Sequence, residues 1–472
     1  MSLYQSVDAY REAHHKQPGE IAARVQEVLD QLNGLGRRLD AVRFTDEGFA
    51  HEQAEQLAAS DQTEQPLAGV PLAHKELYGR AFADGTGWPD EGGSQSCEGQ
   101  TARRTATVID KLDMAGAIDC GRLVSVEYAL GVTGHNAFAG TPKNPWNTAY
   151  ICGGSSSGSG AVVAAGIVPA ALGSDTGGSI RLPAAACGLV GIKPTQGLVS
   201  RAGVFALSNS LDTVGPLSRS VRDGAQIFAR LTGYDAADNQ SLHTAQTAYL
   251  DRLEDGLEGI RMGLAETYFL KGSDTEVADP VAACFEQCAR AGAVCCDIEI
   301  AGIEATNPLN VLLIATEAAH LHKDVVLDRP DQLNDQTLMR ILTGIFTTDD
   351  AYQRLQAARA EFIARTIDEV FEKVDMFMTP VWPFVLPTIK DSDVGANPDA
   401  APLMQRIGHN TRPVNFLGLP AVCLPIGFDR NGLPLSVQLV GKPFSEALLL
   451  RAARAIERDY AFWSARPDLS QL

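Results

Sequence analysis

Residues 153–195, GGSSSGSGAVVAAGIVPAALGSDTGGSIRLPAAACGLVGIKPT, contain two serine turns that are framed by glycines and separated by an apolar run. The first turn spans residues 153–159 and the second spans residues 177–179. A serine hydroxyl beside free backbone N–H groups is what acyl transfer requires, because it combines a nucleophile with donors for a developing oxyanion. The apolar residues around the turns predict a closely packed helix at 161–165 and buried strands at 168–172 and 189–192.

Signals for helices and strands alternate along the whole chain. Residues 349–374 have apolar positions at helical spacing after a Thr348 cap, and residues 376–378 should form a strand after them. Asp279-Pro280 predicts a helix start, because proline suits the first helical position. This alternation predicts an α/β protein: a single α/β/α domain over residues 1–472, with a large mixed sheet covered by helices on both faces.

The composition is that of a globular protein and argues against nucleic acid as a partner. Hydrophobic residues make up 45% of the 472 residues and charged residues 21%. The 58 acidic and 39 basic residues give a formal net charge of −19, which repels phosphate backbones. The first residues show no apolar signal core, and the longest apolar stretch, residues 161–173, is too short for a bilayer. Nine scattered cysteines favour reduced thiols, so we expect no membrane association and a cytoplasmic location.

The first serine turn has three other interpretations. A flexible linker is disfavoured by the apolar flanks, which must be buried. Bare N–H groups at a helix start can cradle a phosphate, although the Walker pattern is absent. Residues 154–158 also match the nucleophile-elbow pattern G-x-S-x-G, which would make Ser156 the nucleophile and a downstream histidine its base. The elbow pattern leaves the second serine turn unexplained, but the residues alone leave these alternatives open.

Lys75 stands at the end of another apolar segment, LAGVPLAHK at residues 67–75. Residues 67–73 predict a short strand, and Pro71 favours an edge position for it. A lysine at a strand end is usually solvated. The apolar setting here predicts burial instead, which would lower the pKa of Lys75 and make it a neutral base.

The cysteines show no metal-binding spacing. Cys284 and Cys288 share a helix face with apolar neighbours, which favours core packing over zinc. Cys295 and Cys296 begin a strand without a CxxC spacing. We therefore expect no metal and no cofactor.

These segments resemble the amidase signature family. The resemblance runs from LAGVPLAHK through the serine turns to NFLGLP at residues 415–420, and it is densest between residues 152 and 216. It implies the α/β/α amidase fold, with the signature core at about residues 65–220 and substrate-pocket loops mainly in residues 310–410. It also implies an enzyme that hydrolyses a carboxylic amide C–N bond and releases ammonia or an amine.

The resemblance further implies a Ser–Ser–Lys triad. Its nucleophile is Ser179, which would attack the amide carbonyl and form an acyl-enzyme. Ser155, whose preceding peptide is typically cis in the family, would pass the proton to the base Lys75. Ser179 follows Ser155 by 24 residues, the spacing associated with the family, which supports Ser155 over Ser156 as the bridging residue. The backbone N–H groups expected to hold the oxyanion belong to Thr176, Gly177, Gly178 and Ser179.

Other residues are expected to support the site, and two positions depart from the family pattern. Arg181 is expected to pair with Asp175 and hold the nucleophile turn, and Ser156 is a further support residue. Glu76 follows the lysine where the family usually has aspartate. Gly408 stands where the A subunits of tRNA-dependent glutamine amidotransferases carry an acid that binds an ammonium group.

The expected function is hydrolysis of a small-molecule amide. One alternative is the A subunit of a tRNA-dependent glutamine amidotransferase, which would need a partner subunit; the changed acid and the negative net charge disfavour it. A second alternative is a catalytically degenerate anion-binding or structural protein. The acyl group, the amine and the oligomeric state stay open, with a homodimer as a common outcome.

Overall fold

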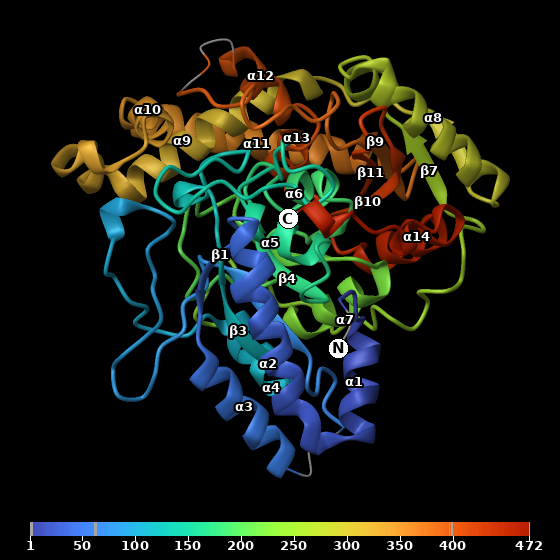
Figure 1. Ribbon diagram of the computed structural model, residues 1–472. Helices are drawn as coiled ribbons and strands as arrows, with labels where there is room; N and C mark the ends of the chain where they lie inside the picture. Colours follow the sequence, from blue (N-terminus) through green and yellow to red (C-terminus); the bar gives the residue numbers. More distant parts are fainter. Residues whose placement is uncertain (1–2, 61–63, 396, 398–399, 472) are drawn as a thin grey trace.

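The strands of the computed structural model form two sheets within the residues that it describes, 3–60, 64–395, 397 and 400–471 (Figure 1). The larger sheet has eight strands in the order β4-β6-β5-β10-β11-β9-β7-β8, and the smaller has the order β1-β3-β2. The strands are β1 (Val42–Thr45), β2 (Pro71–Lys75), β3 (Ile118–Leu123), β4 (Ala170–Asp175), β5 (Val190–Lys193), β6 (Thr213–Ser218), β7 (Arg261–Leu264), β8 (Val294–Asp297), β9 (Met376–Pro380), β10 (Ala421–Phe428) and β11 (Pro434–Gly441).

The larger sheet is mixed, as the sequence predicts. Its neighbours are antiparallel from β4 as far as β9, and β7 pairs in parallel with both β9 and β8. Helix α8 (Thr275–Arg290) connects β7 to β8, because parallel neighbours need a crossover that runs back along the sheet.

Helices flank this sheet in pairs. Helices α7 (Val221–Leu231) and α14 (Glu446–Tyr460) pack on each other and on β6 and β10. Helices α5 (Ser157–Ala164) and α6 (Arg181–Ala186) pack on each other and on β4 and β5. The predicted α/β architecture, a large mixed sheet with flanking helices, is confirmed. The remaining α-helices are α1 (Val7–Lys16), α2 (Ile21–Gln31), α3 (Glu47–Ala59), α4 (Thr107–Met114), α9 (Ile303–Asp328), α10 (Asp335–Ile345), α11 (Asp349–Glu369), α12 (Ala400–Ile407) and α13 (Arg412–Phe416).

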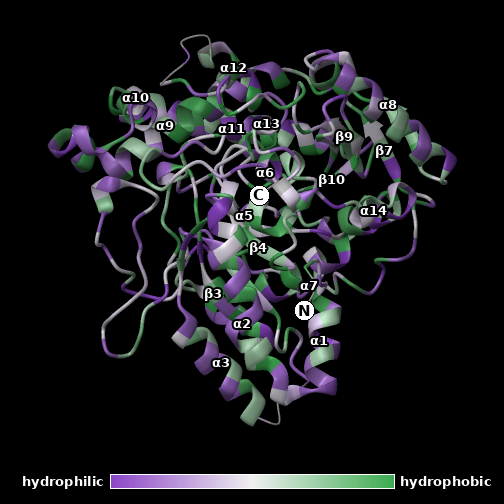
Figure 2. Ribbon diagram, viewed as in Figure 1, coloured by the Kyte–Doolittle hydropathy of each residue, from purple (hydrophilic) through white to green (hydrophobic). Residues whose placement is uncertain are grey.

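The apolar core is centred on the signature segment. All residues of α5 and β4 are buried, and in Figure 2 the hydrophobic colour is strong at β4 while polar residues gather on peripheral helices such as α3. Because α5 and β4 are buried on all sides, their sequence is an apolar run and lacks the separate apolar and polar faces of a half-exposed helix. Within the described residues, no helix has the length and hydropathy needed to span a bilayer.

The smaller sheet places Lys75 beside the larger sheet. Among the described strands, β2 pairs with β3 alone, so it is an edge strand, and its first residue is Pro71, where proline costs no ladder hydrogen bond. Strand β2 also packs against β4. The end of β2 therefore lies next to the end of β4. Strand β4 leads into residues 176–180, which we call the nucleophile turn because they include the predicted nucleophile Ser179.

Three sequence predictions need correction. Helix α8 begins at Thr275 and contains Pro280, because the additional first turn buries Val277. Helix α11 begins after the Thr348 cap, as predicted, but ends at Glu369. Most of residues 310–410 is folded into α9, α10, α11 and α12, so this region is less rich in loops than expected; residues 396 and 398–399 lie outside the described part.

Gly215 on β6 offers a test of how closely β5 and β6 pack. A Cβ at this position would overlap the backbone carbonyl oxygen of Ile192. We expect Gly215→Ala to lower stability by about 1–3 kcal/mol, because a backbone atom cannot move aside cheaply. Thermal unfolding measures the effect. Gly19→Ala, which meets nothing within 4 Å, is the control; equal melting temperatures for the two variants would contradict the packing.

Candidate active site

The lysine and the two serine turns predicted from the sequence meet in the core. Lys75 is the last residue of β2, Ser155 precedes α5, and Ser179 lies in the turn between β4 and α6. Lys75 and Ser155 are fully buried, and Ser179 is 5% exposed. The structure thus brings together residues that are up to 104 positions apart in the chain.

Lys75 is buried beside two serine hydroxyls. Its Nζ donates to Ser155 Oγ at 2.7 Å and to Ser174 Oγ at 2.9 Å. Burial lowers the pKa of Lys75 to about 7, although nearby carboxylates, that of Asp212 first, act in the opposite direction. A lysine with this pKa is unprotonated in a large fraction of molecules near neutral pH, and only that form accepts a proton.

Backbone contacts fix Ser155. The Gly154–Ser155 peptide bond is cis. The Gly154 N–H donates to the carbonyl of Val132 at 2.8 Å, and the Ser155 carbonyl accepts the N–H of Val126 at 3.1 Å. The loop that contains Val126 and Val132 therefore holds Ser155 on both sides of the cis bond.

The carboxylate of Asp175 organises the nucleophile turn. It accepts the backbone N–H groups of Gly178 at 2.8 Å and Ile180 at 3.1 Å. Burial alone would raise the pKa of Asp175, but the guanidinium of Arg181 and the amide of Asn415 hold this pKa well below its usual range. The turn on which Ser179 stands is thus closed around a permanently charged group.

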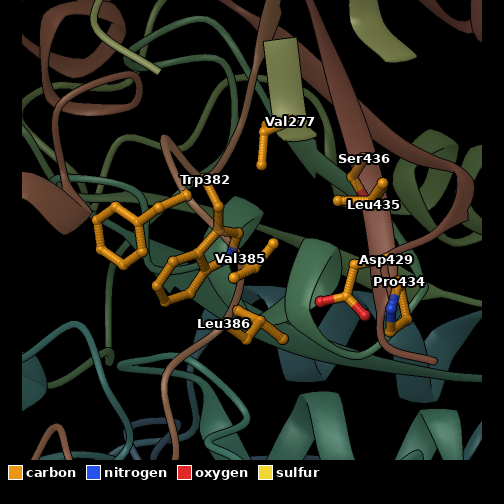
Figure 3. Close-up of a pocket in the computed structure, with 9 residues that line it drawn as sticks. Val277, Trp382, Val385, Leu386, Asp429, Pro434, Leu435 and Ser436 are labelled. Carbon is orange, nitrogen blue, oxygen red and sulfur yellow. The ribbon is translucent and has the colours of Figure 1, made fainter. Parts of the chain in front are cut away.

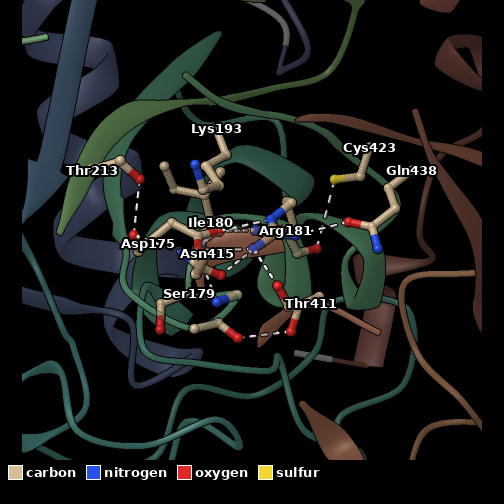
Figure 4. Close-up of polar contacts among 12 residues, drawn as sticks. Asp175, Ser179, Ile180, Arg181, Lys193, Thr213, Thr411, Asn415, Cys423 and Gln438 are labelled. Carbon is tan, nitrogen blue, oxygen red and sulfur yellow. Dashed lines mark hydrogen bonds and ion pairs between the residues drawn. The ribbon is translucent and has the colours of Figure 1, made fainter. Parts of the chain in front are cut away.

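Arg181 is the counter-ion of Asp175 and anchors the turn to the C-terminal part of the chain (Figure 4). Its Nε and Nη2 both lie 3.1 Å from the carboxylate oxygens, and neither side chain is exposed. Nη1 donates to Gln438 Oε1 at 2.8 Å, and Nη2 to Asn415 Oδ1 at 2.5 Å. Because all three nitrogens of this guanidinium donate within the protein and the side chain is fully buried, Arg181 supports the turn and does not face a substrate.

Ser156 ties the two serine turns together. Its Oγ donates to the carbonyl of Ser179 at 2.6 Å and lies 3.4 Å from the carbonyl of Ser174. Among the described residues, the hydrogen-bond partners of Ser156 Oγ are these two carbonyls, and neither can act as a base. The contacts therefore do not support the elbow interpretation, in which Ser156 is the nucleophile and a histidine its base.

The predicted set of oxyanion donors needs one correction. The N–H of Gly178 is already donated to Asp175 and is not available to a substrate. In the described chain, the N–H groups of Thr176, Gly177 and Ser179 have no acceptor. A developing oxyanion can therefore meet up to three unoccupied donors in this turn.

The hydroxyl of Ser179 is not bonded to that of Ser155 in this structure. Of the hydrogen bonds between described residues, none connects Ser179 Oγ to Ser155 Oγ. Catalytic hydrogen bonds often become short only when a substrate is bound, so this geometry is compatible with proton transfer between the two hydroxyls.

Two buried acids flank the lysine. Glu76 accepts the N–H of Ser125 at 2.7 Å and its hydroxyl at 3.2 Å, and burial raises the pKa of Glu76 to about 7. The longer acid therefore leaves Lys75 in place. Asp212 accepts Thr176 Oγ1 at 2.6 Å, which connects the base side of the site to the nucleophile turn.

Four polar residues of the site escaped the sequence analysis. Asp212 lies in the SLDTVGP segment that carries the family resemblance, but nothing local indicates its contact with the nucleophile turn. Ser174 stands on β4 within the opening segment, but nothing local indicates that its hydroxyl meets Lys75. Asn415 and Gln438 reach the site from α13 and β11, so spacing along the chain gives no signal for them. The four residues are Ser174, Asp212, Asn415 and Gln438.

A cavity of about 400 Å³ leads toward the lysine side of the site and has the size of a small-ligand cavity. Ser174 and Asp212 line it, together with the residues around Arg201. The hollow in Figure 3 is different: its volume is about 10 Å³, enough for roughly one water molecule. Its lining includes Val277 and Trp382 but no triad residue, so it is not a substrate site.

The described residues contain no group of three or more His, Cys, Asp or Glu side chains placed to hold a metal ion. All nine cysteines are free thiols, and Cys284 and Cys288 are buried in the core, as expected.

Comparisons with known proteins agree on one family. A family model described as Amidase matches residues 23–450. The A subunit of glutamyl-tRNA(Gln) amidotransferase from Neisseria meningitidis is 34% identical over 475 residues, covering 94% of both chains. A peptide amidase solved in complex with the competitive inhibitor chymostatin is 27% identical over 98% of both chains, with a TM-score of 0.84. A structure that concerns a vestigial protein complex and the evolutionary origins of an s-triazine catabolic enzyme is 28% identical over 98% of this chain and 100% of that one, with a TM-score of 0.89.

Replacing Asp175 should damage both stability and the nucleophile turn. Asp175→Asn leaves Arg181 buried without a counter-ion, and breaking a buried pair in this way costs about 3–5 kcal/mol. We expect a markedly lower melting temperature. The control is Asp40→Asn, whose partner Lys143 is 39% exposed and whose ion pair should contribute about 0–1 kcal/mol. Similar melting temperatures for the two variants would show that the buried pair does not hold the turn.

Proposed function

We propose a catalytic mechanism for this chain, which belongs to the amidase signature family and is an amide hydrolase: Ser179 attacks the carbonyl carbon of a carboxylic amide, with Ser155 and Lys75 as its proton relay. The observation that carries the proposal is the 2.7 Å hydrogen bond from the Lys75 Nζ to Ser155 Oγ, beside a turn that offers Ser179 and unoccupied N–H groups.

The proton moves in two steps. Neutral Lys75 accepts the proton of Ser155 as Ser155 accepts that of Ser179, and Ser179 Oγ forms a bond to the carbonyl carbon. When the tetrahedral intermediate collapses, the C–N bond breaks and Ser155 returns a proton to the departing nitrogen. Water then attacks the acyl-enzyme by the same relay in reverse and releases the acid.

The oxyanion is stabilised by backbone groups. We assign this role to the N–H groups of Thr176, Gly177 and Ser179, because the Asp175 carboxylate occupies that of Gly178. One such donor typically contributes about 10²–10³ in rate. The positive φ of Gly178, 130°, allows the backbone to turn its remaining donors the same way.

We further propose one amidase domain over residues 1–472 that acts on a small-molecule amide. The N- and C-terminal parts share one apolar cluster, from Val7 to Ile456, and the Val7 N–H donates to Asp223 Oδ1 at 2.9 Å. The free cysteines support a reducing, cytoplasmic location. The negative net charge argues against nucleic acid as a partner. A homodimer stays a prediction.

The amidotransferase alternative is supported by the 34% identity to the Neisseria protein. The structure around Gly408 argues against it. A Cβ at this position would lie 2.5 Å from Arg412 Cζ, so an ammonium group here would meet a cation instead of an acid. Glutaminase activity together with co-purification of a partner subunit would favour the alternative.

The rate should depend on pH through Lys75. Because the neutral amine is the base, kcat/KM should rise about tenfold per pH unit below pH 7 and level off above it. Asp212→Asn removes the carboxylate that raises the pKa of Lys75 most, so the rising limb should move to lower pH. Lys75→Arg should be inactive at every pH. A limb that stays fixed in Asp212→Asn, or activity in Lys75→Arg, would contradict the assignment of the base.

Single serine substitutions separate the two turns. Ser179→Ala should abolish turnover and labelling by a serine-directed phosphonate while the melting temperature stays near that of the wild type. Ser155→Ala should lose at least about 10²-fold in kcat, the usual range for a proton-transfer group. Ser156→Ala should retain labelling at Ser179. Labelling at Ser156, or no labelling of the wild type, would favour the elbow mechanism or a degenerate site, respectively.

A further inference from the structure

Two arginines near the nucleophile turn form no ion pair with any described residue. Arg412, at the start of α13, is 9% exposed, and its Nη1 donates to Asn307 Oδ1 and to the carbonyl of Gln405, both at 3.2 Å. Arg340, on α10, donates to the carbonyl of Leu130 at 2.7 Å. All three acceptors are neutral, so neither guanidinium has a counter-ion within the described chain.

The missing counter-ions have an electrostatic consequence. Burial lowers the pKa of both arginines to about 10, and the charge of Arg412 lowers that of Arg340 further. Arg412 is buried and Arg340 is partly buried, and a charge removed from water without a partner is costly. The chain has 19 more acidic than basic residues, yet none of the described acids forms an ion pair with Arg412 or Arg340. The described part of the chain therefore leaves this pair without a neutralising anion.

Both arginines contact segments that position the triad. A Cβ added to Gly177 would lie 3.4 Å from Arg412 Cγ, which places this side chain against the turn of Ser179. Arg340 is bonded to Leu130, and the next residue, Gly131, has its carbonyl oxygen 3.1 Å from a Cβ added to Gly154. Arg412 thus lies against the nucleophile turn, and Arg340 is bonded to the loop that holds Ser155.

A third donor completes the cluster. Asn310 on α9 is fully buried, and neither its Nδ2 nor its Oδ1 has a hydrogen-bond partner. Its Oδ1 lies 3.5 Å from a Cβ added to Gly177, so the side chain points toward the same turn as Arg412. An unsatisfied buried amide indicates a ligand, because leaving it unbonded costs free energy.

We propose that the substrate carries a carboxylate close to its amide bond, and that Arg412, Arg340 and Asn310 bind this carboxylate. This rests on the proposed function, because it specifies the substrate of the same site. Gly177 and Ser179 are two residues apart, at most about 7 Å of chain. A carboxylate separated from the amide carbonyl by a short carbon chain would therefore reach the cluster while the carbonyl lies at Ser179. The substrate class is monoamides of short dicarboxylic acids.

The test compares two amides of nearly equal shape. Succinamate carries a carboxylate, and 4-oxopentanamide replaces it with a neutral methyl ketone. The wild type should prefer succinamate in kcat/KM. Arg412→Gln should reduce kcat/KM for succinamate about 10- to 100-fold, the range of a lost hydrogen bond to a charged group, and change that for 4-oxopentanamide less than about threefold. Arg340→Gln should also reduce kcat/KM for succinamate more than that for 4-oxopentanamide. This variant provides the test if Arg412→Gln does not fold.

A matched control separates recognition from stability. Arg451 is similarly buried, at 8% exposure, and its acceptors among the described residues are likewise neutral: the backbone carbonyls of Gly256 and Glu258. Arg451→Gln should leave the preference between the two amides unchanged. Calorimetric binding of succinate, with inorganic phosphate as a second probe, gives a readout that does not depend on turnover; Arg412→Gln should weaken succinate binding at least about tenfold.

Several results would overturn the proposal. Equal use of both amides by the wild type would do so while leaving amide hydrolysis intact. Equal loss for both amides in Arg412→Gln would show a structural role. Phosphate binding as tight as succinate binding would indicate a general anion site. If the wild type cleaves no amide and Ser179 is not labelled, the proposed function fails, and succinate binding alone then decides whether the cluster accepts a carboxylate.

Discussion

The buried carboxylate of Asp175 is the constraint on which the rest of the site depends. Six hydrogen bonds converge on its two oxygens: three from the backbone of the nucleophile turn, two from Arg181 and one from Asn415. One charge therefore sets the conformation of the turn and links it to α13. It also removes the Gly178 N–H from the oxyanion site, so the group that builds the turn also determines which of its donors a substrate can use.

Burial disfavours the charged form of both groups at the centre, yet their charge states differ. Asp175 stays ionised because Arg181 and the surrounding donors compensate its desolvation. Lys75 receives only two hydroxyls as hydrogen-bond acceptors, so burial lowers its pKa to about 7. The same dry core thus makes one group a fixed charge and the other a proton acceptor. The difference arises from the partners that each side chain meets, not from its depth.

The sequence revealed the parts of the site that are local in the chain. Ser155, Ser179 and Lys75 stand in recognisable segments, and the apolar run between the serine turns indicated its buried helix and strand. Residues that act through distant contacts gave no signal: Gln438 meets Arg181 across 257 positions. The start of α8 was misplaced for a related reason, since burial of Val277 in the tertiary structure outweighed the local preference of Asp279-Pro280 for a first turn. Local chemistry was predictable, and long-range pairing was not.

The site divides its charges across the nucleophile turn. The acids Asp212, Glu76 and Asp175 raise the pKa of Lys75, whereas Arg412 adjoins Gly177 and has no counter-ion among the described residues. The negative charge that develops on the carbonyl oxygen during attack is stabilised by the backbone N–H groups of the turn. In the proposed arrangement the guanidinium of Arg412 is left to the substrate carboxylate, so oxyanion stabilisation and recognition of an anionic substrate use different groups of the same turn.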